Sequence, residues 1–183
     1  SVAVSEGVKT DLISFGVLEN KTFVINNSYR NLNINEAKEI NLKDWYEHKG
    51  PKLISIANLK TEKNISNLLK SISLIKNHNS SVNIKLLIAG KGPLESNLKL
   101  ESKKLGIESE VVFAGIIKNP FIYLDIADLF VLSSDFEGFG IVIIEAMSLG
   151  KTIVSTESEG PSEILKKGKL GYLCKINDPE DLA

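Results

Sequence analysis

This 183-residue chain has few of the residues that build several common kinds of site. It has one cysteine, Cys174, which excludes an internal disulfide and a cysteine-rich metal site, and we expect this side chain to be a buried, small apolar group. Its two histidines, His48 and His78, lie among polar residues and suggest neither a general base nor a metal ligand. We therefore expect no metal site.

The chain also lacks an excess of charge and long apolar runs. Lysine and arginine number 22 against 23 acidic residues, and Arg30 is the single arginine. This balance gives no general attraction for nucleic acid, so we predict no nucleic-acid partner. No apolar run approaches the roughly 20 residues that a membrane-spanning helix needs, and no signal-peptide pattern opens the sequence. We expect a cytoplasmic protein, with any membrane contact peripheral and at the inner face of the cell membrane.

What the sequence does contain, from residue 52 onward, is a regular alternation of apolar strand-like runs with helical patterns. This alternation predicts an α/β fold, a Rossmann-like parallel sheet with helices on both faces. In such sheets, ligands bind beyond the carboxyl ends of the strands. We predict strands at 53–57, 84–89, 111–113, 129–132, 152–154 and 171–173, and helices at 64–76, 93–105, 120–126, 141–149 and 161–166.

The first 50 residues follow a different pattern. Ser5 is suited to be the N-cap of a short helix. Further on, Trp45 and Tyr46 lie among charged residues in a polar stretch, which is typical of a linker that docks on a neighbouring surface. We predict strands at 1–5 and 22–25 and a helix at 6–13.

Two glutamates, Glu137 and Glu145, flank a glycine-containing turn that leads from the strand at 129–132 into an apolar helix. If this helix begins near Gly140, its first amides are unsatisfied and carry partial positive charge, which suits a phosphate. Helical side chains tilt toward the N-terminus, so Glu145 leans back toward Glu137 and both carboxylates can face one bound molecule. Such an arrangement suits a sugar nucleotide. The alternative is that Glu137 is an ordinary loop acid and Glu145 an exposed helix residue.

The surrounding residues carry a family resemblance. The segments 133–140 and 145–147, followed by Gly150, resemble the signature of retaining glycosyltransferases of family 4, of the GT-B type. Four further segments are similar to that family in the right order, so the resemblance covers residues 51–183. They are Ile88-Ala89-Gly90-Lys91-Gly92-Pro93, Val112-Phe113-Ala114-Gly115-Ile116-Ile117, Gly160-Pro161-Ser162-Glu163-Ile164 and Gly171-Tyr172-Leu173.

The resemblance implies the C-terminal half of a GT-B enzyme. By it, residues 1–27 are the end of an N-terminal acceptor-binding domain and residues 28–50 a linker. Residues 51–183 are then a nucleotide-sugar-binding domain, truncated at its C-terminal end. A fragment of this kind is expected to bind the donor but to transfer no sugar alone, because the acceptor contacts belong to the missing N-terminal domain.

The resemblance also implies site residues. Glu137 would hold hydroxyls of the donor sugar and Lys63 the diphosphate, and these two are our catalytic candidates. Glu145 would hold the ribose hydroxyls, and no metal or other cofactor is expected. The remaining donor-binding candidates are the backbone around Gly138, Phe139, Gly140 and Ile141 for the phosphates, Ile117 for the base, Gly90 and Gly92 for the cleft wall, and Asn58.

Asn58 marks a departure from the family, which usually shows Gly-Arg where this chain has Ala57-Asn58. An asparagine donates a hydrogen bond but supplies no charge, and arginine is not replaced without loss at bidentate phosphate sites. Lys60, two positions away, is a possible substitute. The departure leaves open a different phosphate grip, a weaker enzyme or another donor class.

The expected reaction moves a sugar from a nucleoside diphosphate sugar to a glycolipid or polysaccharide. A UDP-linked hexose or N-acetylhexosamine is favoured because residues 159–164 are similar to family members that use such donors. The alternatives are a noncatalytic nucleotide-sugar-binding domain and a sugar-nucleotide epimerase of related fold. A receiver-like signalling domain fits poorly, since Asn58 follows the early strand where its phosphoacceptor aspartate is needed. Nearby, we expect Glu163 to be a first-turn helix acid, and Phe136 and Tyr172 to be core residues.

Overall fold

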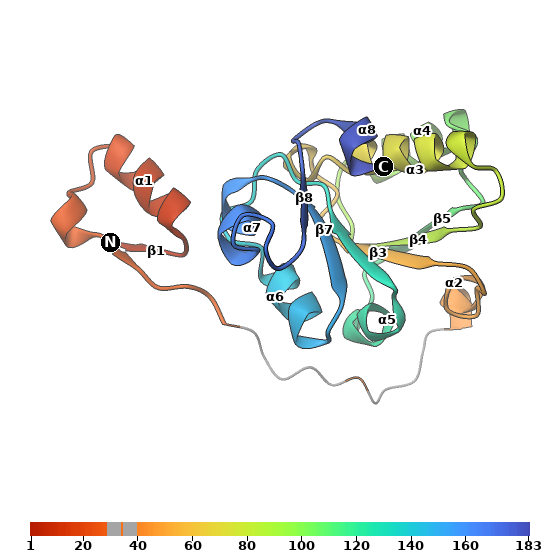
Figure 1. Cartoon of the computed structure of the whole chain (residues 1–183), viewed down its shortest axis with the longest axis horizontal. Helices are drawn as coiled ribbons and strands as arrows, with labels where there is room; N and C mark the ends of the chain where they lie inside the picture. Colours follow the sequence, from red (N-terminus) through yellow and green to blue (C-terminus); the bar gives the residue numbers. More distant parts are fainter. Residues whose placement is uncertain (29–33, 35–39) are drawn as a thin grey trace.

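The structure is a computed structural model that describes residues 1–28, 34 and 40–183. Residues 29–33 and 35–39, which include Arg30 and part of the predicted linker, lie outside the described residues. Figure 1 shows a small N-terminal unit beside a larger α/β unit.

The larger unit is built on a six-stranded parallel sheet with the strand order β5-β4-β3-β6-β7-β8. This order confirms the predicted Rossmann-like fold, including the weak last strand. The strands are β3 (Lys52–Ile56), β4 (Lys85–Ala89), β5 (Val111–Gly115), β6 (Leu129–Leu132), β7 (Thr152–Thr156) and β8 (Tyr172–Cys174).

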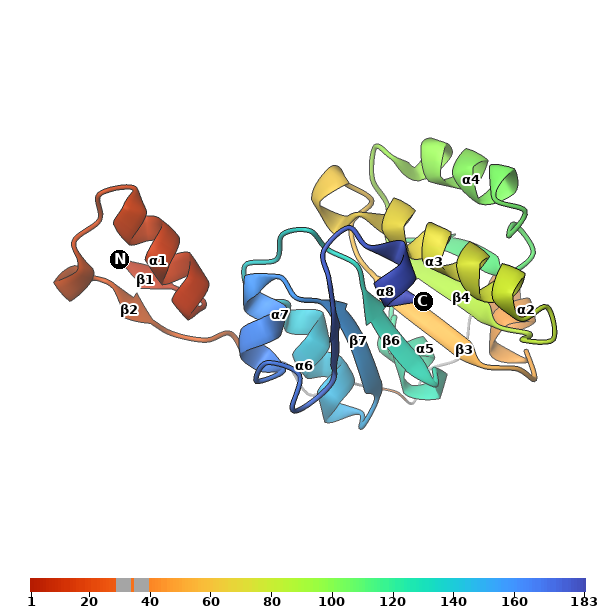
Figure 2. The same cartoon turned by 45° about the horizontal axis from the view of Figure 1, so that its top comes forward.

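Helices cover both faces of this sheet (Figures 1 and 2). Successive strand residues point to opposite faces, so Ile54 and Phe130 enter one core while Leu53 and Val131 enter the other. Both faces are therefore apolar, as in other parallel sheets. The first core is covered by α2 (Lys43–Tyr46), α5 (Phe121–Ile126) and α6 (Ile141–Ser148), and the second by α3 (Ile65–His78), α4 (Glu95–Lys104) and α8 (Pro179–Leu182).

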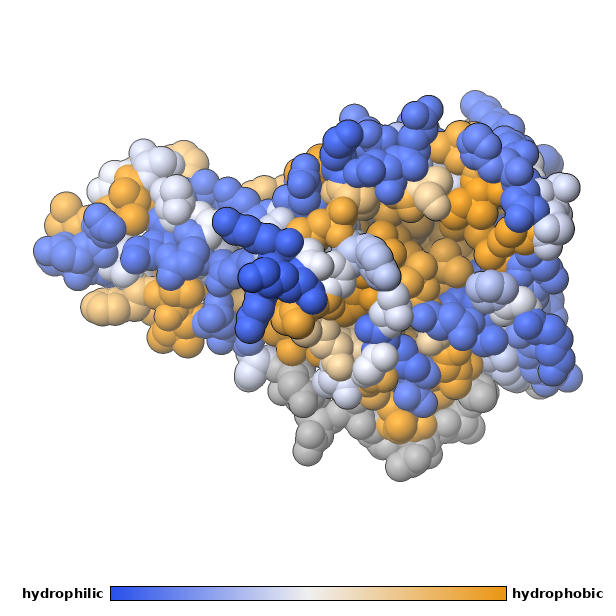
Figure 3. Space-filling model, in the orientation of Figure 1, coloured by the Kyte–Doolittle hydropathy of each residue, from blue (hydrophilic) through white to orange (hydrophobic). Residues whose placement is uncertain are grey.

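The N-terminal unit contains β1 (Val2–Ala3) paired in parallel with β2 (Phe23–Val24), helix α1 (Glu6–Ser14) and the 3-10 turn η1 (Glu19–Lys21). The predicted cap of α1 is confirmed, because Ser5 Oγ accepts a hydrogen bond from Val8 N at 3.2 Å. Five apolar side chains of this unit are exposed: Val2, Phe15, Leu18, Phe23 and Ile25. Figure 3 shows hydrophobic surface, in orange, on this unit.

The segment that contains Trp45 packs into the first core. It forms the 3-10 turn η2 (Ile40–Leu42) and then α2. Trp45 is fully buried, donates from Nε1 to Lys85 O at 3.1 Å, and lies edge-on to Tyr123 with ring centroids 6.0 Å apart. This end of the predicted linker therefore contributes a large aromatic side chain to the α/β unit.

Three expectations about single residues were wrong. Phe136 and Tyr172 are 57% and 68% exposed, because neither the loop after β6 nor the edge strand β8 turns these side chains inward. Glu163 lies in the last turn of α7 (Glu159–Ile164), because this helix begins two residues before Pro161. Proline is tolerated in the first turn of a helix, where its missing N–H is not needed.

The expectation for Cys174 is confirmed. Its side chain is buried, and burial together with nearby Asp181 raises its pKa to about 11. Among the helices that the structure describes, none is long and apolar enough to cross a membrane.

Candidate functional site

The candidate site lies where strands β3 and β6 are neighbours in the middle of the sheet. The strand order changes direction at this point, since β4 and β5 extend to one side and β7 and β8 to the other. Ligands of open α/β sheets bind beyond the carboxyl ends of the strands at such a switch point. Two loops meet there, residues 57–64 after β3 and residues 133–140 after β6.

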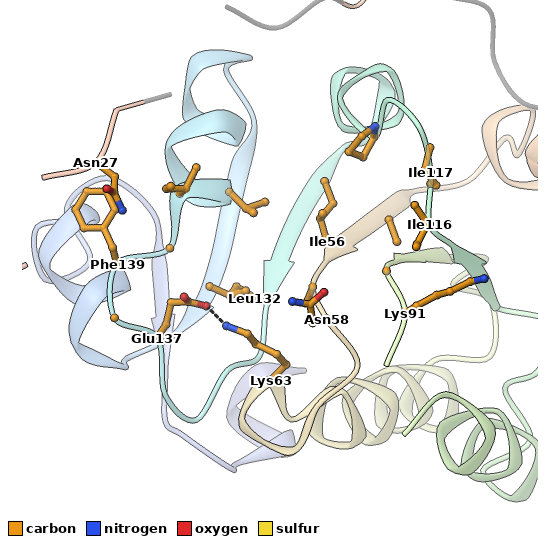
Figure 4. Close-up of a pocket in the computed structure, with 18 of the residues that line it drawn as sticks. Asn27, Ile56, Asn58, Lys63, Lys91, Ile116, Ile117, Leu132, Glu137 and Phe139 are labelled. Atoms are coloured by element: carbon orange, nitrogen blue, oxygen red, sulfur yellow. Dashed lines mark hydrogen bonds and ion pairs between the residues drawn. The ribbon is translucent and has the colours of Figure 1, made fainter. Parts of the chain in front are cut away.

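A cavity of about 660 Å³ opens between these loops (Figure 4), within the size range of small-molecule sites. It takes residues from both loops, from the ends of β3, β4 and β6, and from the N-terminal unit. Its lining residues are Val4, Asn27, Ile56, Ala57, Asn58, Lys63, Ala89, Gly90, Lys91, Ile116, Ile117, Pro120, Leu132, Glu137, Gly138, Phe139, Gly140, Ile141 and Val142.

Lys63 and Glu137, 74 residues apart in the sequence, form an ion pair in this cavity. Lys63 Nζ lies 2.5 Å from Glu137 Oε2, and each side chain is 19% exposed. Lys63 ends the 3-10 turn η3 (Thr61–Lys63). The sequence predicted both residues in one site, and the structure brings them into direct contact.

The two loops are also fastened to each other near this pair. Ser133 Oγ donates to Lys63 O at 3.0 Å. Asn64 adopts the left-handed backbone region (φ 39°), which asparagine tolerates better than most residues, and its Oδ1 caps α3 by accepting from Asn67 N. Its Nδ2 donates to Asp135 Oδ1 at 2.7 Å. These contacts hold the ion pair between fixed backbone segments.

The start of α6 forms another wall of the cavity. The helix begins at Ile141, as predicted, after Gly140 at φ 91°, a conformation that glycine adopts without strain. No side chain caps this end, and Ile143 N donates to Gly140 O at 2.9 Å, so the amides of Ile141 and Val142 are the ones placed to meet a phosphate. Gly138, Phe139, Gly140 and Ile141, the predicted phosphate-binding backbone, all line the cavity.

Glu145 lies one helical turn further along α6 and is not among the residues that line the cavity. Its side chain is partly buried, and burial raises the pKa of its carboxyl above the ordinary value. A carboxylate therefore stays partly desolvated on the helix that borders the cavity. The structure does not bring it onto the wall that Glu137 occupies.

The other predicted residues separate into two groups. Asn58, Gly90 and Ile117 line the cavity. A Cβ at Gly90 would lie 2.0 Å from Ala57 O, so only glycine fits between the ends of β3 and β4. Gly92 lies outside the lining and packs against Leu59.

The sequence missed part of the cavity wall. Lys60, the suggested substitute for the absent arginine, does not line the cavity, whereas Lys91 does. The position of Lys91 between Gly90 and Gly92, in the predicted turn after a strand, could have indicated that Lys91 lies at the cavity. Ile116 is 74% exposed at the cavity while its neighbour Ile117 is buried, and no local pattern distinguishes the two.

Titratable metal ligands do not converge in the part of the chain that the structure describes. Within residues 1–28, 34 and 40–183, no three histidine, cysteine, aspartate or glutamate side chains are grouped so that they could hold a metal ion.

The sequence family "Glycosyl transferases group 1" matches residues 37–183, most of the chain. The chain belongs to this family. It is 34% identical over 131 residues to the N-acetyl-alpha-D-glucosaminyl L-malate synthase of Bacillus anthracis, which covers 72% of this chain and 34% of that protein.

A second relative matches nearly the whole chain. It is a Campylobacter jejuni 4-alpha-N-acetylgalactosaminyltransferase that acts on a diphospho-undecaprenol substrate, according to its name, and it is 27% identical over 97% of this chain and 47% of its own length. The chain thus spans between a third and a half of these curated relatives.

Solved structures confirm the GT-B fold. Anabaena HepE in complex with UDP and glucose superposes with a TM-score of 0.84 at 22% identity, over 100% of this chain and 51% of that chain. WaaG, a glycosyltransferase involved in lipopolysaccharide biosynthesis, superposes with a TM-score of 0.76 at 16% identity, over 95% of this chain and 48% of its own.

Proposed function

We propose that this chain binds the donor for a retaining glycosyltransferase that moves a sugar from a UDP-sugar to a glycolipid or polysaccharide acceptor. The observation that carries the proposal is the Lys63–Glu137 ion pair in the switch-point cavity, beside the uncapped start of α6. Lys63 and Glu137 satisfy each other in the structure. A nucleoside diphosphate sugar offers a complementary group to each of them.

In the proposed reaction, the bond between the anomeric carbon and the diphosphate oxygen breaks, and its electron pair leaves with the diphosphate. Lys63 and the first amides of α6 stabilise this negative charge. Positive groups held in place before the reaction stabilise the transition state more than the ground state. The acceptor oxygen forms its new bond to the anomeric carbon on the face that the diphosphate leaves, which retains the configuration. The proton of the acceptor hydroxyl passes to an oxygen of the departing diphosphate.

Glu137 serves this reaction by orienting the donor. Its carboxylate accepts hydrogen bonds from hydroxyls of the sugar, which sets the anomeric carbon beside the Lys63 end of the cavity.

Glu145 accepts from the ribose hydroxyls when the bound nucleotide extends along α6. Burial raises the pKa of its carboxyl, and a hydrogen bond from a ribose hydroxyl would favour the ionised form. Asn58 hydrogen-bonds the phosphates without adding charge, and no metal ion takes part.

The class of donor and acceptor is supported by the relatives. One solved neighbour holds UDP and glucose, and two curated relatives are named for N-acetylhexosaminyl products or substrates. We propose a UDP-linked hexose or N-acetylhexosamine as the donor. The name of the Campylobacter relative supports a lipid-linked acceptor, and with it a cytoplasmic location and peripheral contact with the membrane.

Binding measurements test this proposal. We expect isothermal titration calorimetry of the 183-residue chain to show binding of UDP and tighter binding of one UDP-linked hexose or N-acetylhexosamine than of GDP- or ADP-linked sugars. Absence of binding for all three nucleotide classes would contradict the proposal. With a glycolipid acceptor added, we expect no sugar transfer by the chain alone, because it spans half or less of the length of these curated relatives and we propose that the acceptor contacts lie outside it.

A noncatalytic nucleotide-sugar-binding domain is the second candidate function. Asn58 favours it, because this cavity residue supplies no charge for the departing diphosphate. The two candidates differ in one measurement. Replacing Asn58 with arginine raises the affinity for UDP in either case, but it raises the rate of donor hydrolysis only when the site already supports bond cleavage.

A further inference from the structure

Helix α7 contacts the loop after β6 on one side. Gly160 N donates to Glu137 O at 3.1 Å. A Cβ at Gly160 would lie 2.6 Å from Phe139 Cα, so α7 and this loop pack backbone against backbone. The position of α7 therefore determines where the backbone of Glu137 lies.

On its other side, α7 reaches the N-terminal unit through Glu163. The Glu163 Oε2 atom accepts from Glu6 N at 2.8 Å, and its Oε1 atom accepts from Asn26 Nδ2 at 3.3 Å. Glu6 N belongs to the first turn of α1, where unsatisfied amides and the helix dipole favour a negative charge. Asn26 Nδ2 also donates to Val4 O at 3.0 Å. One carboxylate thus contacts both the first turn of α1 and the segment after β2.

Ser5 adds a direct bond between the N-terminal unit and the glycine loop. Its side chain is fully buried, and its Oγ donates to Gly138 O at 2.7 Å while accepting from Val8 N. The hydroxyl uses its donor and acceptor capacity at once. The start of α1 is therefore tied to the residue that follows Glu137.

These contacts adjoin the cavity. Val4 precedes Ser5, Asn27 follows Asn26, and both Val4 and Asn27 line the cavity. Figure 4 labels both Asn27 and Phe139 among the residues that line the cavity. The same contacts that join α1 to α7 therefore also set the wall of the cavity that the N-terminal unit supplies.

We propose that Glu163 is a positioning residue for donor binding: it fastens α1 onto α7 and so holds the Val4 and Asn27 wall against the loop that carries Glu137. This inference rests on the proposed function for its effect on the donor, but the contact itself can be tested without a ligand. Glu163 acts through other residues, since it does not line the cavity.

The test uses the whole 183-residue chain, three variants of the contact and one control variant. Glu163→Ala removes both acceptor atoms, whereas Glu163→Gln keeps one side-chain oxygen that accepts from Glu6 N. Gly7→Leu perturbs the same contact from the other side, because a Cβ at Gly7 would lie 2.2 Å from Glu159 Oε2 and 2.9 Å from Glu159 Cβ. Glu157→Ala, an exposed carboxylate two residues before α7, is the matched control.

Amide hydrogen exchange is measured first. We expect Glu163→Ala and Gly7→Leu to speed exchange at residues 6–8 and at residues 138–140 by roughly tenfold, with β3 and β4 unchanged. Calorimetry with UDP-glucose then shows affinity lowered by roughly fivefold in both variants. In Glu163→Gln, we expect the exchange rates and the UDP-glucose affinity to return most of the way to those of the unmodified chain. In Glu157→Ala, we expect both to equal those of the unmodified chain.

Two results would overturn the inference. The first is exchange at residues 138–140 that stays unchanged in Glu163→Ala, because the contact would then not position the loop. The second is faster exchange at β3 and β4 in the same variant, which would indicate general loss of stability. If the unmodified chain binds neither UDP nor UDP-glucose, the proposed function fails, and the exchange data still decide whether Glu163 holds the loop.

Discussion

Two lysine–glutamate pairs of nearly equal length lie in different regions of this molecule. Lys63 and Glu137 are 2.5 Å apart in the cavity at the β3–β6 switch point, and Lys76 and Glu110 are 2.6 Å apart between the end of α3 and the segment before β5. Distance alone does not separate a site residue from a structural one. The groups that surround each pair distinguish the two.

The second pair is satisfied by the fold around it. Lys76 Nζ also donates to Gly106 O at 2.8 Å, and Ser109 Oγ donates to the Glu110 carboxylate at 3.0 Å. Burial opposes ionisation of Glu110, but the hydrogen bonds from Lys76 and Ser109 outweigh it, so the pKa of Glu110 lies below its ordinary value. This pair therefore connects the end of α3 to the residue before β5. By contrast, the first pair faces a cavity flanked by backbone amides, which is the setting for a ligand.

The largest expected effect separates the two lysines. Lys63→Ala weakens UDP binding about 10- to 100-fold, because a charge-assisted hydrogen bond contributes about 1.5–3 kcal/mol and about 1.4 kcal/mol corresponds to a factor of ten. Calorimetry measures the change. Lys76→Ala is the matched control and leaves UDP affinity unchanged. Equal affinities of the two variants would remove the distinction between the pairs.

A second prediction concerns Glu145, which the structure places on α6 outside the cavity lining. Glu145→Ala lowers UDP affinity roughly tenfold, or about 1.4 kcal/mol, if its carboxylate accepts from ribose hydroxyls. Glu108→Ala, which removes an exposed carboxylate before β5, serves as the control in the same titrations. Unchanged binding by the Glu145 variant would remove this residue from the donor site.

A third prediction tests the structural pair by stability. Lys76→Met lowers the free energy of unfolding by about 0.5–1 kcal/mol at pH 7, a value kept small because Lys76 is 38% exposed and solvent screens the pair. Urea denaturation measures this difference.

The pH dependence of this difference has a definite sign. The folded pKa of Glu110 lies below 4.5, so the stabilisation is complete above that pH and is lost as the pH falls through the folded value. The two chains should therefore converge in stability in acid. A difference that persists below the folded pKa would show that packing of Lys76, and not its charge, is responsible.

The smallest expected effect has the opposite sign. Burial raises the pKa of Glu145, so its ionised form is a cost to the fold that develops as the pH rises above 4.5. Glu145→Gln should raise the free energy of unfolding by about 0.5 kcal/mol at pH 7, as expected where a site residue is kept at the expense of stability. The gain should vanish near pH 4. A loss of stability at pH 7 would show that the carboxylate has a stabilising partner.

Local sequence patterns were sufficient to predict the sheet and most helix positions. Helix α6 begins at Ile141 as predicted, because Gly140 provides the required turn, and α4 begins two residues after the predicted Pro93. The central strands β3, β4 and β6 follow apolar runs that are buried on both faces. These signals are local, so a single sequence carries them.

Contacts between distant segments could not be predicted in the same way. The Lys63–Glu137 bond depends on β3 and β6 being neighbours, and Glu163 meets Glu6 across 157 residues. The burial of Trp45 and the exposure of Phe136 likewise depend on which surface covers each residue. Family resemblance pointed to Lys63 and Glu137, which the cavity brings together, but also to Glu145 and Gly92, which lie outside its lining. The roles of all these residues stay predictions.

Calorimetry of Glu137→Ala tests the central claim most directly. UDP and the UDP-sugar that binds the unmodified chain most tightly are titrated against both proteins. We expect the affinity for UDP not to fall, because Lys63 keeps its charge and loses an internal partner, while the affinity for the UDP-sugar falls roughly tenfold. Equal losses for UDP and the UDP-sugar would contradict the claim that Glu137 holds the sugar.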